Sequence, residues 1–322
     1  MPSPDASGGR AATDTSTVLV VGPGWLGRPL AQQLAADGHA VCTLQRSAPV
    51  PATATTHTGV TALTGDIAAA SNVTALAAIR ATLPPRIDHL VVCIAPSRAR
   101  GDDYGVYPQA ATGAAALARA MGIRSVLYVS STGVYDRQDG SEVTEQSVIT
   151  PHDARVQALY DAEQHIAALA TNEPPRDVTV HIVRAAGLYG PQRDPAARFA
   201  DPAFAAANVW CNFSWRDDVI SAITHLLTHD RAPGARVFNC ADGTPLRSAD
   251  IAEALTGRAM PAPAAPAAPA AIDRGAPVRS GRSNQRINVD ALLATGWRPV
   301  APTVYDGLRL LGHQVPFAPR PS

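Results

Sequence analysis

Three glycines at the spacing G-x-G-x-x-G lie near the start of the chain, in the segment Gly22-Pro23-Gly24-Trp25-Leu26-Gly27. In this motif the first glycine permits a tight turn, the second lets the backbone approach a pyrophosphate, and the third lets a helix pack closely on a strand. Unpaired N–H groups at the following helix N-terminus favour the bound anion. The spacing therefore predicts that a dinucleotide binds to Gly22, Gly24, Trp25, Leu26 and Gly27.

The segments on either side of the motif support this interpretation. Residues 17–21 form a short run rich in valine, which is typical of a strand buried on both faces of a parallel sheet. Residues 26–36 have apolar side chains at helical spacing, and residues 40–44 form a second apolar run. The order strand, glycine turn, helix, strand distinguishes a dinucleotide site from an ordinary turn that contains the same glycines.

The end of the second predicted strand indicates which dinucleotide binds. A site that prefers NAD usually has an acid there, which bonds the ribose 2′-hydroxyl, whereas an arginine suits the 2′-phosphate of NADP. This chain has Gln45-Arg46-Ser47 at that place and no acid. We therefore expect Arg46 and Ser47 to bind NADP(H) in preference to NAD(H). The alternative is that Arg46 is a solvated surface charge.

Further candidate residues follow the later predicted strands, at the edge where open α/β sheets bind their ligands. Asp66 and Ile67 follow the third strand, and Asp66 is expected either to hold an adenine amino group or to cap the next helix. Ala95 and Pro96 follow the fourth strand, where the chain would pass beneath the cofactor. A run of hydroxyl groups, Ser130-Ser131-Thr132-Gly133-Val134-Tyr135, follows the fifth. Together they predict a cofactor and small-molecule site.

The elements that must position these residues alternate between strands and helices. The predicted strands are residues 17–21, 40–44, 60–63, 90–94, 126–129 and 178–183. The predicted helices are residues 26–36, 72–82, 110–121 and 153–170, and residues 138–151 read as a polar loop. This alternation predicts an α/β fold, with a doubly wound parallel (Rossmann) sheet.

The second half of the chain is less regular. We expect a polar, alanine-rich connection over 193–207, short strands over 209–214 and 237–240, and helices over 215–228, 248–255 and 303–311. Residues 1–16 are expected to form a disordered tail, and residues 260–272 a proline- and alanine-rich surface loop. The predicted organisation is a dinucleotide-binding domain at 17–191 and a smaller substrate-binding lobe at 192–322, interleaved with the core.

Composition excludes several function classes. The 322 residues carry no net charge, which argues against nucleic acid or a membrane surface as the main partner. No run approaches 18 apolar residues, and the first 16 residues lack the apolar core of a signal peptide, so we expect a cytoplasmic protein. The four cysteines form no C-x-x-C motif and the nine histidines show no ligand spacing, so no metal site is expected.

Taken in order, these motifs resemble those of the extended short-chain dehydrogenase/reductase superfamily, of the nucleotide-sugar epimerase/dehydratase type. The resemblance covers roughly residues 17 to 312. It is carried by the glycine motif, Gly65-Asp66, residues 130–135, residues 184–191, Arg216-Asp217-Asp218 and Gly296-Trp297-Arg298-Pro299. More narrowly, V-G-x-G-x-L-G together with S-S-T-G-V-Y resembles the atypical, YeeZ-like branch.

The resemblance implies roles for individual residues. Ser131 falls where the family has a catalytic serine or threonine, which polarises a substrate carbonyl or hydroxyl. The implied cofactor contacts beyond the glycine motif include Ser130, Ala186 and Gly187. The implied substrate neighbours are Thr132, Tyr135, Asn212 and Trp215. The family often dimerises through the helices after the fourth and fifth strands, so a homodimer is also expected.

One part of the family pattern is absent. The family uses Y-x-x-x-K at the start of the helix after the serine strand, where lysine lowers the tyrosine pKa so that the phenol can transfer a proton. Anchoring on Glu163-Gln164 places the tyrosine position at Arg155 and the lysine position at Leu159. A second register uses Tyr160 and Gln164, but five positions along a helix is a rotation of about 500°, so the first is preferred. The chain contains no lysine at all.

Three functions remain open from the sequence. The first is an NADP(H)-dependent oxidoreductase that reduces a small carbonyl or imine, with Tyr160, Tyr135, Glu145 or a water molecule as proton donor. The second is a non-catalytic NADP(H)-binding sensor or scaffold, which loss of the tyrosine–lysine pair favours. The third is a sugar-nucleotide epimerase or dehydratase, which would need the proton transfer that this loss makes difficult. We rank them in that order.

Overall fold

The structure is a computed structural model that describes residues 15–47, 59–96, 103–171, 177–257 and 283–315. The expected tail, apart from residues 15 and 16, and the proline- and alanine-rich loop at 260–272 lie outside the described residues. Among the residues that are described, no helix is long and apolar enough to cross a membrane.

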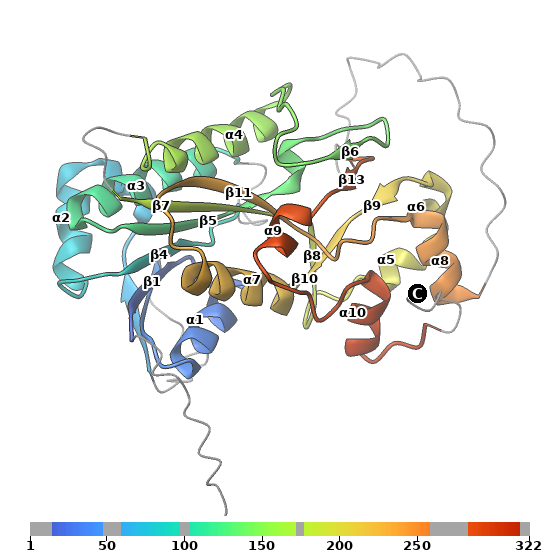
Figure 1. Cartoon of the computed structure of the whole chain (residues 1–322), viewed down its shortest axis with the longest axis horizontal. Coiled ribbons are helices and arrows are strands. Elements are labelled where there is room, and N and C mark those ends of the chain that lie inside the picture. The colour runs from blue at the N-terminus through green and yellow to red at the C-terminus, as the bar shows by residue number, and fades with distance from the viewer. Residues whose placement is uncertain (1–14, 48–58, 97–102, 172–176, 258–282, 316–322) are drawn as a thin grey trace, which may run out of the picture.

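A seven-stranded sheet forms the centre of the molecule (Figure 1). In spatial order its strands are β3 (Val60–Thr64), β2 (Ala40–Gln45), β1 (Thr17–Val21), β4 (His89–Val92), β5 (Ser125–Ser131), β7 (Thr179–Ala185) and β11 (Gly234–Cys240). Every neighbouring pair is parallel. This is the Rossmann order with a seventh strand added, and it confirms the predicted fold class.

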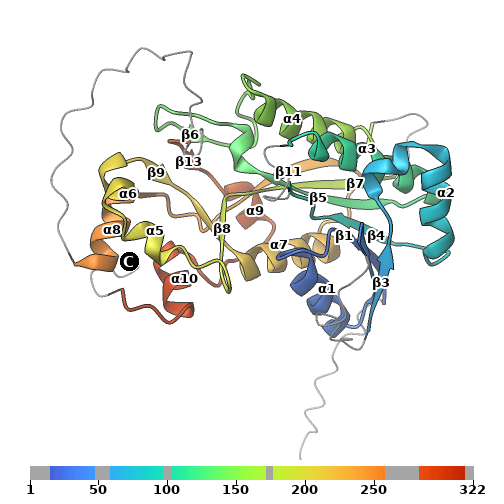
Figure 2. The same cartoon turned by 180° about the vertical axis from the view of Figure 1, so that it is seen from behind.

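Helices cover both faces of the sheet, because successive side chains of a strand point to opposite faces and apolar side chains lie on both. Leu19 and Val21 of β1 pack on the face covered by α2 (Val73–Thr82), α3 (Val106–Met121) and α4 (Ala154–Ala167). Val18 and Val20 pack on the opposite face, under α1 (Gly27–Ala36) and α7 (Arg216–His229). Figures 1 and 2 show α3 and α4 on one side of the sheet and α1 and α7 on the other.

Local sequence explains where several of these helices begin. The Asn72 side chain accepts hydrogen bonds from the N–H groups of Thr74 and Ala75, which caps α2. The Asp153 side chain accepts the N–H of Val156 and caps α4. Each cap satisfies backbone donors that have no partner inside the helix.

The second half of the chain supplies strand β11 to the sheet and helix α7 to one of its faces, and its other elements form a smaller unit at one end of the sheet (Figure 1). Its elements are β8 (Gly187–Tyr189), α5 (Ala196–Phe199), α6 (Pro202–Ala207), β9 (Trp210–Cys211), β10 (Phe213–Trp215), β12 (Leu246–Arg247), α8 (Ser248–Thr256), α9 (Asp290–Ala294) and α10 (Val304–Leu310). An aromatic cluster forms much of its core, including Tyr189, Phe199, Phe204, Phe213 and Trp215.

The structure differs from the predicted elements in three places. The connection at 193–207 contains α5 and α6, because Phe199 and Phe204 are buried and their rings stack 5.1 Å apart, while Asp201 caps α6. The strand expected over 209–214 is divided into β9 and β10 at Asn212, whose side chain bonds the backbone of Gln285 and Ile287. The polar loop at 138–151 contains β6 (Glu142–Val143), which pairs in parallel with β13 (Arg286–Ile287).

Candidate cofactor and substrate site

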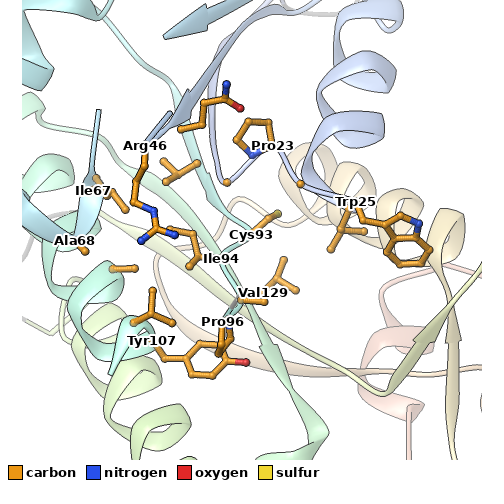
Figure 3. Close-up of a pocket in the computed structure, with 18 of the residues that line it drawn as sticks. Pro23, Trp25, Arg46, Ile67, Ala68, Cys93, Ile94, Pro96, Tyr107 and Val129 are labelled. Atoms are coloured by element: carbon orange, nitrogen blue, oxygen red, sulfur yellow. The ribbon is translucent and has the colours of Figure 1, made fainter. Parts of the chain in front are cut away.

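A pocket of about 690 Å³ lies at the carboxyl ends of the central strands, beside the point between β1 and β4 where the strand order reverses (Figure 3). Open α/β sheets bind ligands at such a point. The predicted cofactor residues in its lining are Gly22, Gly24, Trp25, Leu26, Arg46, Ser47, Asp66, Ile67, Ala95, Pro96, Ser130 and Ala186. The predicted catalytic residue Ser131 also lines it, whereas Gly27 and Gly187 do not.

The glycine turn has the geometry that a pyrophosphate needs. Gly22 has φ of +85°, and a Cβ added to it would lie 2.7 Å from the Cys93 carbonyl oxygen. A Cβ added at Gly27 would collide with the carbonyl oxygen of Gly22, so this glycine allows α1 to begin against the turn. A Cβ added at Gly24 would meet nothing within 4 Å. The backbone at Gly24 therefore faces open space in the pocket, and these residues fit a dinucleotide.

Trp25 connects the glycine turn to the segment after β7. Its indole N–H donates to the Pro191 carbonyl oxygen at 2.8 Å, and the Arg193 guanidinium lies 4.2 Å from the centre of its ring. The Arg216 guanidinium lies 5.4 Å from the same ring. Arg193 itself lines the pocket, close to the turn where the pyrophosphate is expected. The sequence analysis missed Arg193, because only the fold brings residues 190–193 to the glycine motif.

The opposite end of the pocket is formed by the residues after β2 and β3. Figure 3 shows the Arg46 side chain extending into the pocket. Asp66 accepts the N–H of Ala68 at 3.1 Å and caps the short 3-10 helix Ile67–Ser71, so the capping role expected as one alternative is present. Arg46 and Ser47 thus both line the pocket at the end of β2.

Ser131 and Tyr107 line another part of the same pocket. Ser131 ends β5, and its Oγ accepts the N–H of Gly133 at 3.1 Å. Tyr107 lies in the first turn of α3, and Figure 3 shows its ring at the edge of the pocket. Burial raises the pKa of the Tyr107 phenol, while the charge of Arg155 acts in the opposite direction. Tyr107 was also missed, since the sequence alone placed it in a loop before the helix.

The two positions of the absent tyrosine–lysine pair lie beside Ser131. Leu159 lines the pocket, and the Arg155 guanidinium lies so close to Gly133 that a Cβ at Gly133 would collide with it. Tyr160, from the alternative register, is partly buried against the apolar cluster that includes Leu159, but it is not part of the lining.

A buried polar network underlies this part of the pocket. The Ser130 hydroxyl donates to Glu163 at 2.6 Å, and the Arg184 guanidinium donates to both carboxylate oxygens of Glu163. Arg184 also donates to the Tyr135 oxygen at 2.6 Å, and Tyr135 donates to Asn239 at 2.8 Å. Burial raises the pKa of Tyr135, which is 4% exposed and does not line the pocket. The network joins β5, α4, β7 and β11.

The predicted substrate neighbours lie outside the pocket lining. Thr132 is buried, and its carbonyl oxygen accepts a hydrogen bond from Gln285. Trp215 is buried in the aromatic cluster, with its ring 5.4 Å from that of Tyr189. The side chain of Asn212 bonds backbone groups at 285 and 287. The Thr132 carbonyl and the Asn212 side chain thus contact residues 285–287, and Trp215 packs within the core of the smaller unit.

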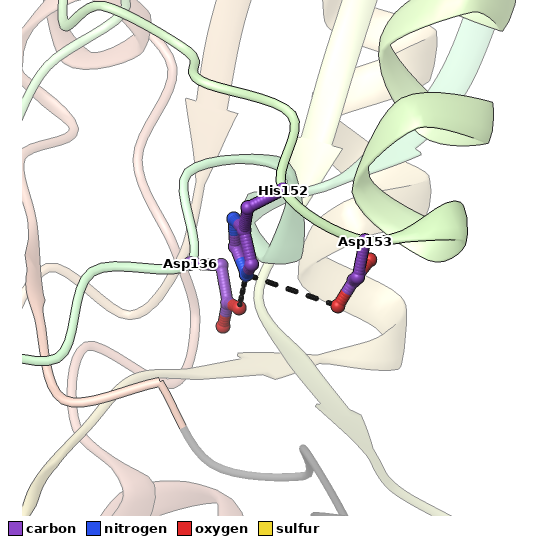
Figure 4. A group of neighbouring side chains, drawn as sticks. All are labelled: Asp136, His152 and Asp153. Carbon is purple, nitrogen blue, oxygen red and sulfur yellow. Dashed lines mark ion pairs between the residues drawn. The ribbon is translucent and has the colours of Figure 1, made fainter. Parts of the chain in front are cut away.

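A separate cluster brings together Asp136, His152 and Asp153 (Figure 4). The His152 Nε2 atom lies 2.9 Å from an Asp136 oxygen and 3.8 Å from an Asp153 oxygen. Asp153 also caps α4, and His152 is half exposed. The ion pair between His152 and Asp136, together with the capping role of Asp153, accounts for this grouping, so we assign no metal to it.

Comparisons with known proteins agree with this geometry. The family model described as NAD(P)H-binding matches residues 22–230. The chain is 29% identical to the protein YeeZ of Escherichia coli K12 over 248 residues, which is 72% of this chain and 80% of YeeZ. A structure from Methylobacillus flagellatus, described as an NAD-dependent epimerase/dehydratase, is 27% identical, with a TM-score of 0.67 over 92% of this chain and 97% of that one.

A more distant structure shares the fold. The UDP-glucose 4-epimerase of Thermus thermophilus, in complex with NAD, is 20% identical with a TM-score of 0.65, covering 91% of this chain and 97% of that one. The family match spans more than half of the chain and includes the glycine turn, the second strand beside it and the serine strand. The chain therefore belongs to the NAD(P)H-binding family, within the NAD-dependent epimerase/dehydratase superfamily that its sequence resembles.

Proposed function

We propose that this protein is an NADP(H)-dependent oxidoreductase that reduces a small carbonyl or imine substrate. The observation that carries the proposal is a single pocket lined by the glycine turn and Arg46 as well as by Ser131 and Tyr107. When bound, the cofactor supplies a hydride to the substrate carbon. The Ser131 hydroxyl is placed to donate a hydrogen bond to the substrate oxygen or nitrogen and so polarise the bond that is reduced.

Tyr107 is the proton donor in this proposal. Among the described residues of the lining it is the only phenol, whereas Tyr135 and Tyr160 lie outside the lining. Burial keeps the Tyr107 phenol protonated, and the fixed charge of Arg155 stabilises the phenolate that forms when the proton is given up. Arg155 would thus supply the positive charge that lysine supplies in the family. Because an arginine stays charged, it would do so as a fixed charge and not as a base.

A non-catalytic NADP(H)-binding sensor or scaffold is the second candidate. The observation that favours it is Leu159, which lines the pocket at the position of the family lysine and can neither donate nor accept a proton. Epimerase or dehydratase chemistry on a sugar nucleotide is the third candidate. It ranks last because its reversible proton transfer depends most on the tyrosine–lysine pair that this chain lacks.

Turnover of single variants separates the first candidate from the second. We expect the wild-type protein to oxidise NADPH in the presence of members of a panel of aldehydes, ketones and imines. Ser131→Ala and Tyr107→Phe should each lower kcat by about 10²- to 10⁴-fold, the range for general acid–base groups, while Kd for NADPH stays within about twofold.

Tyr160→Phe is the matched control, because it removes a phenol from the same region but outside the lining. Full activity in Tyr107→Phe, with loss in Tyr160→Phe, would contradict the assignment of the proton donor. NADPH binding without turnover of any panel member would favour the sensor or scaffold.

A further inference from the structure

The charged side chains of the pocket lining are mostly positive. Among the described residues, the lining contains three arginines and one acid, namely Arg28, Arg46, Arg193 and Asp66. NADP(H) carries negative charge at two places, the pyrophosphate and the ribose 2′-phosphate. Arg46, at the end of β2, is the residue proposed for the 2′-phosphate, whereas Arg193 lies beside the glycine turn that is expected to bind the pyrophosphate.

The Trp25 side chain holds the Arg193 guanidinium beside the glycine turn. Trp25 directly follows Gly24, the second glycine of the motif. The guanidinium lies 4.2 Å from the centre of the indole ring, within the range of a cation–π interaction. The indole N–H donates to the Pro191 carbonyl oxygen at 2.8 Å, two residues before Arg193. Two separate contacts therefore tie the segment that carries Arg193 to the turn.

The segment itself is a tight turn. Gly190 and Arg193 exchange two backbone hydrogen bonds, of 3.2 and 2.9 Å, across Pro191 and Gln192. Gln192 has φ of +67°, and proline followed by a residue with positive φ is the pattern of a type II turn. The turn and the contacts of Trp25 restrict the directions that the Arg193 side chain can take. Such preorganisation lowers the entropy that is lost when a ligand binds.

We propose that Arg193 binds the pyrophosphate of the cofactor and that Trp25 positions it. The inference rests on the cofactor binding in the proposed function and does not depend on the chemical step. Backbone N–H groups at the helix N-terminus favour the anion, and a guanidinium adds paired, charge-assisted hydrogen bonds to phosphate oxygens. The Arg216 guanidinium lies 5.4 Å from the same ring, but it pairs with Asp217 at 2.7 Å and does not line the pocket.

Calorimetric titration tests the contact without turnover. Because NADPH and NADH both carry a pyrophosphate, Arg193→Gln should lower the affinity for each by the same factor, at least about tenfold. ADP-ribose 2′-phosphate, which keeps the pyrophosphate but lacks the nicotinamide, should lose affinity by that factor as well. Arg193→Lys should recover only part of the loss, since an ammonium group lacks the planar fork of a guanidinium.

Arg216→Gln is the matched control, because it removes an arginine from the same indole ring outside the pocket lining. It should change the affinity for NADPH by less than about twofold. A loss equal to that in Arg193→Gln would reduce the effect to the total charge near Trp25 and would overturn the inference.

A double-mutant cycle tests the positioning role of Trp25. Trp25→Leu removes both the ring and the indole N–H, so it should weaken NADPH binding at least about fivefold in the wild-type background. In the Arg193→Gln background the same change should cost much less, because both changes remove one shared interaction. Trp25→Phe, which keeps a ring face for the guanidinium, should have an intermediate effect. Additive losses would show that Trp25 acts independently of Arg193 and would overturn its positioning role.

The outcomes separate this inference from the proposed function. If NADPH binds and Arg193→Gln changes its affinity by less than about threefold, the inference falls and the oxidoreductase proposal stands. Weaker binding of NADPH and NADH with unchanged binding of ADP-ribose 2′-phosphate would move the contact to the nicotinamide end and would also overturn the inference. If neither NADPH nor NADH binds to the wild-type protein, both fall together.

Discussion

Arg46 is the positively charged side chain that extends into the pocket from the end of β2. If it binds the 2′-phosphate, its replacement should affect only the dinucleotide that carries this group. We expect Arg46→Gln to lower NADPH affinity about tenfold, equivalent to about 1.4 kcal/mol, and to leave NADH affinity unchanged. Calorimetric titration with each cofactor measures both values.

Arg80→Gln, on the exposed surface of α2, is the control for the change in net charge. Equal losses of affinity for NADPH and NADH in Arg46→Gln would mean that Arg46 contacts a group present in both cofactors. The basis for an NADP preference would then be removed.

Some residues that line the pocket could be predicted from the sequence, and others could not. Arg46 and Ser131 could be placed at one edge because the carboxyl ends of parallel strands share that edge. Tyr107 and Arg193 could not, because their positions depend on where α3 begins and on how the chain after β7 folds back to Trp25. Such contacts join residues far apart in the sequence and leave no local pattern.

At the scale of elements, the buried Glu163–Arg184 pair fixes α4 against β5 and β7. Glu163 is 1% exposed and Arg184 is 4% exposed. Burial alone would lower the pKa of Arg184, but its hydrogen bonds and ion pair with Glu163 raise it. Glu163→Gln would leave the buried arginine without a counter-charge, so we expect the free energy of unfolding to fall by about 3–5 kcal/mol.

Urea unfolding followed by circular dichroism measures this loss. The control is Arg86→Gln, which breaks the pair between Arg86 and Asp88; Arg86 is 86% exposed, so the change should cost less than about 1 kcal/mol. Similar losses in the two variants would show that the buried network contributes no more than a surface ion pair.

The elements of the first half were predictable, and several of the second half were not. A parallel strand buried on both faces needs a continuous apolar run, which the sequence shows for β1, β2, β4, β5 and β7. The pairing of β6 with β13 involves two residues from each strand, Glu142 with Arg286 and Val143 with Ile287, which lie far apart in the sequence. Periodicity cannot be recognised in segments of that length.

For the molecule as a whole, His89 links stability to pH. It lies at the start of β4, with its Nδ1 atom 2.8 Å from the Ser125 hydroxyl. Burial lowers the His89 pKa from 6.5 to about 4, Asp88 opposes this shift, and Arg231 adds to it. The unfolded chain therefore binds a proton below pH 6.5 that the folded chain takes up only near pH 4. The contribution of His89 to stability is full above about pH 6.5 and is lost as the pH falls toward about 4.

As the pH falls from about 7 to about 5, we expect protonation of His89 in the unfolded chain to lower the free energy of unfolding by about 2 kcal/mol. His89→Gln should reduce the pH dependence of stability by that amount, and His165→Gln, which changes an exposed histidine of α4, should not. Urea unfolding at several pH values across this range provides the comparison. Parallel pH profiles for wild type and His89→Gln would contradict the expectation.

The homodimer stays a prediction, but the structure limits which side chains of α3 and α4 could contact a second copy. The alanines of α3, including Ala110, Ala111, Ala114 and Ala118, are buried within the chain's own core. They already pack against the sheet and the neighbouring helix, so a second copy would have to contact other side chains of α3 and α4.

The seventh strand has a consequence for biosynthesis. Until the ribosome has released residues 234–240, β7 has no neighbour on its outer side, although all seven of its side chains are buried in the finished protein. An open edge of this kind invites pairing with another nascent chain. The newly made protein therefore passes through a stage at which β7 is an open edge, and we expect fragments that end before β11 to aggregate more readily than the full chain.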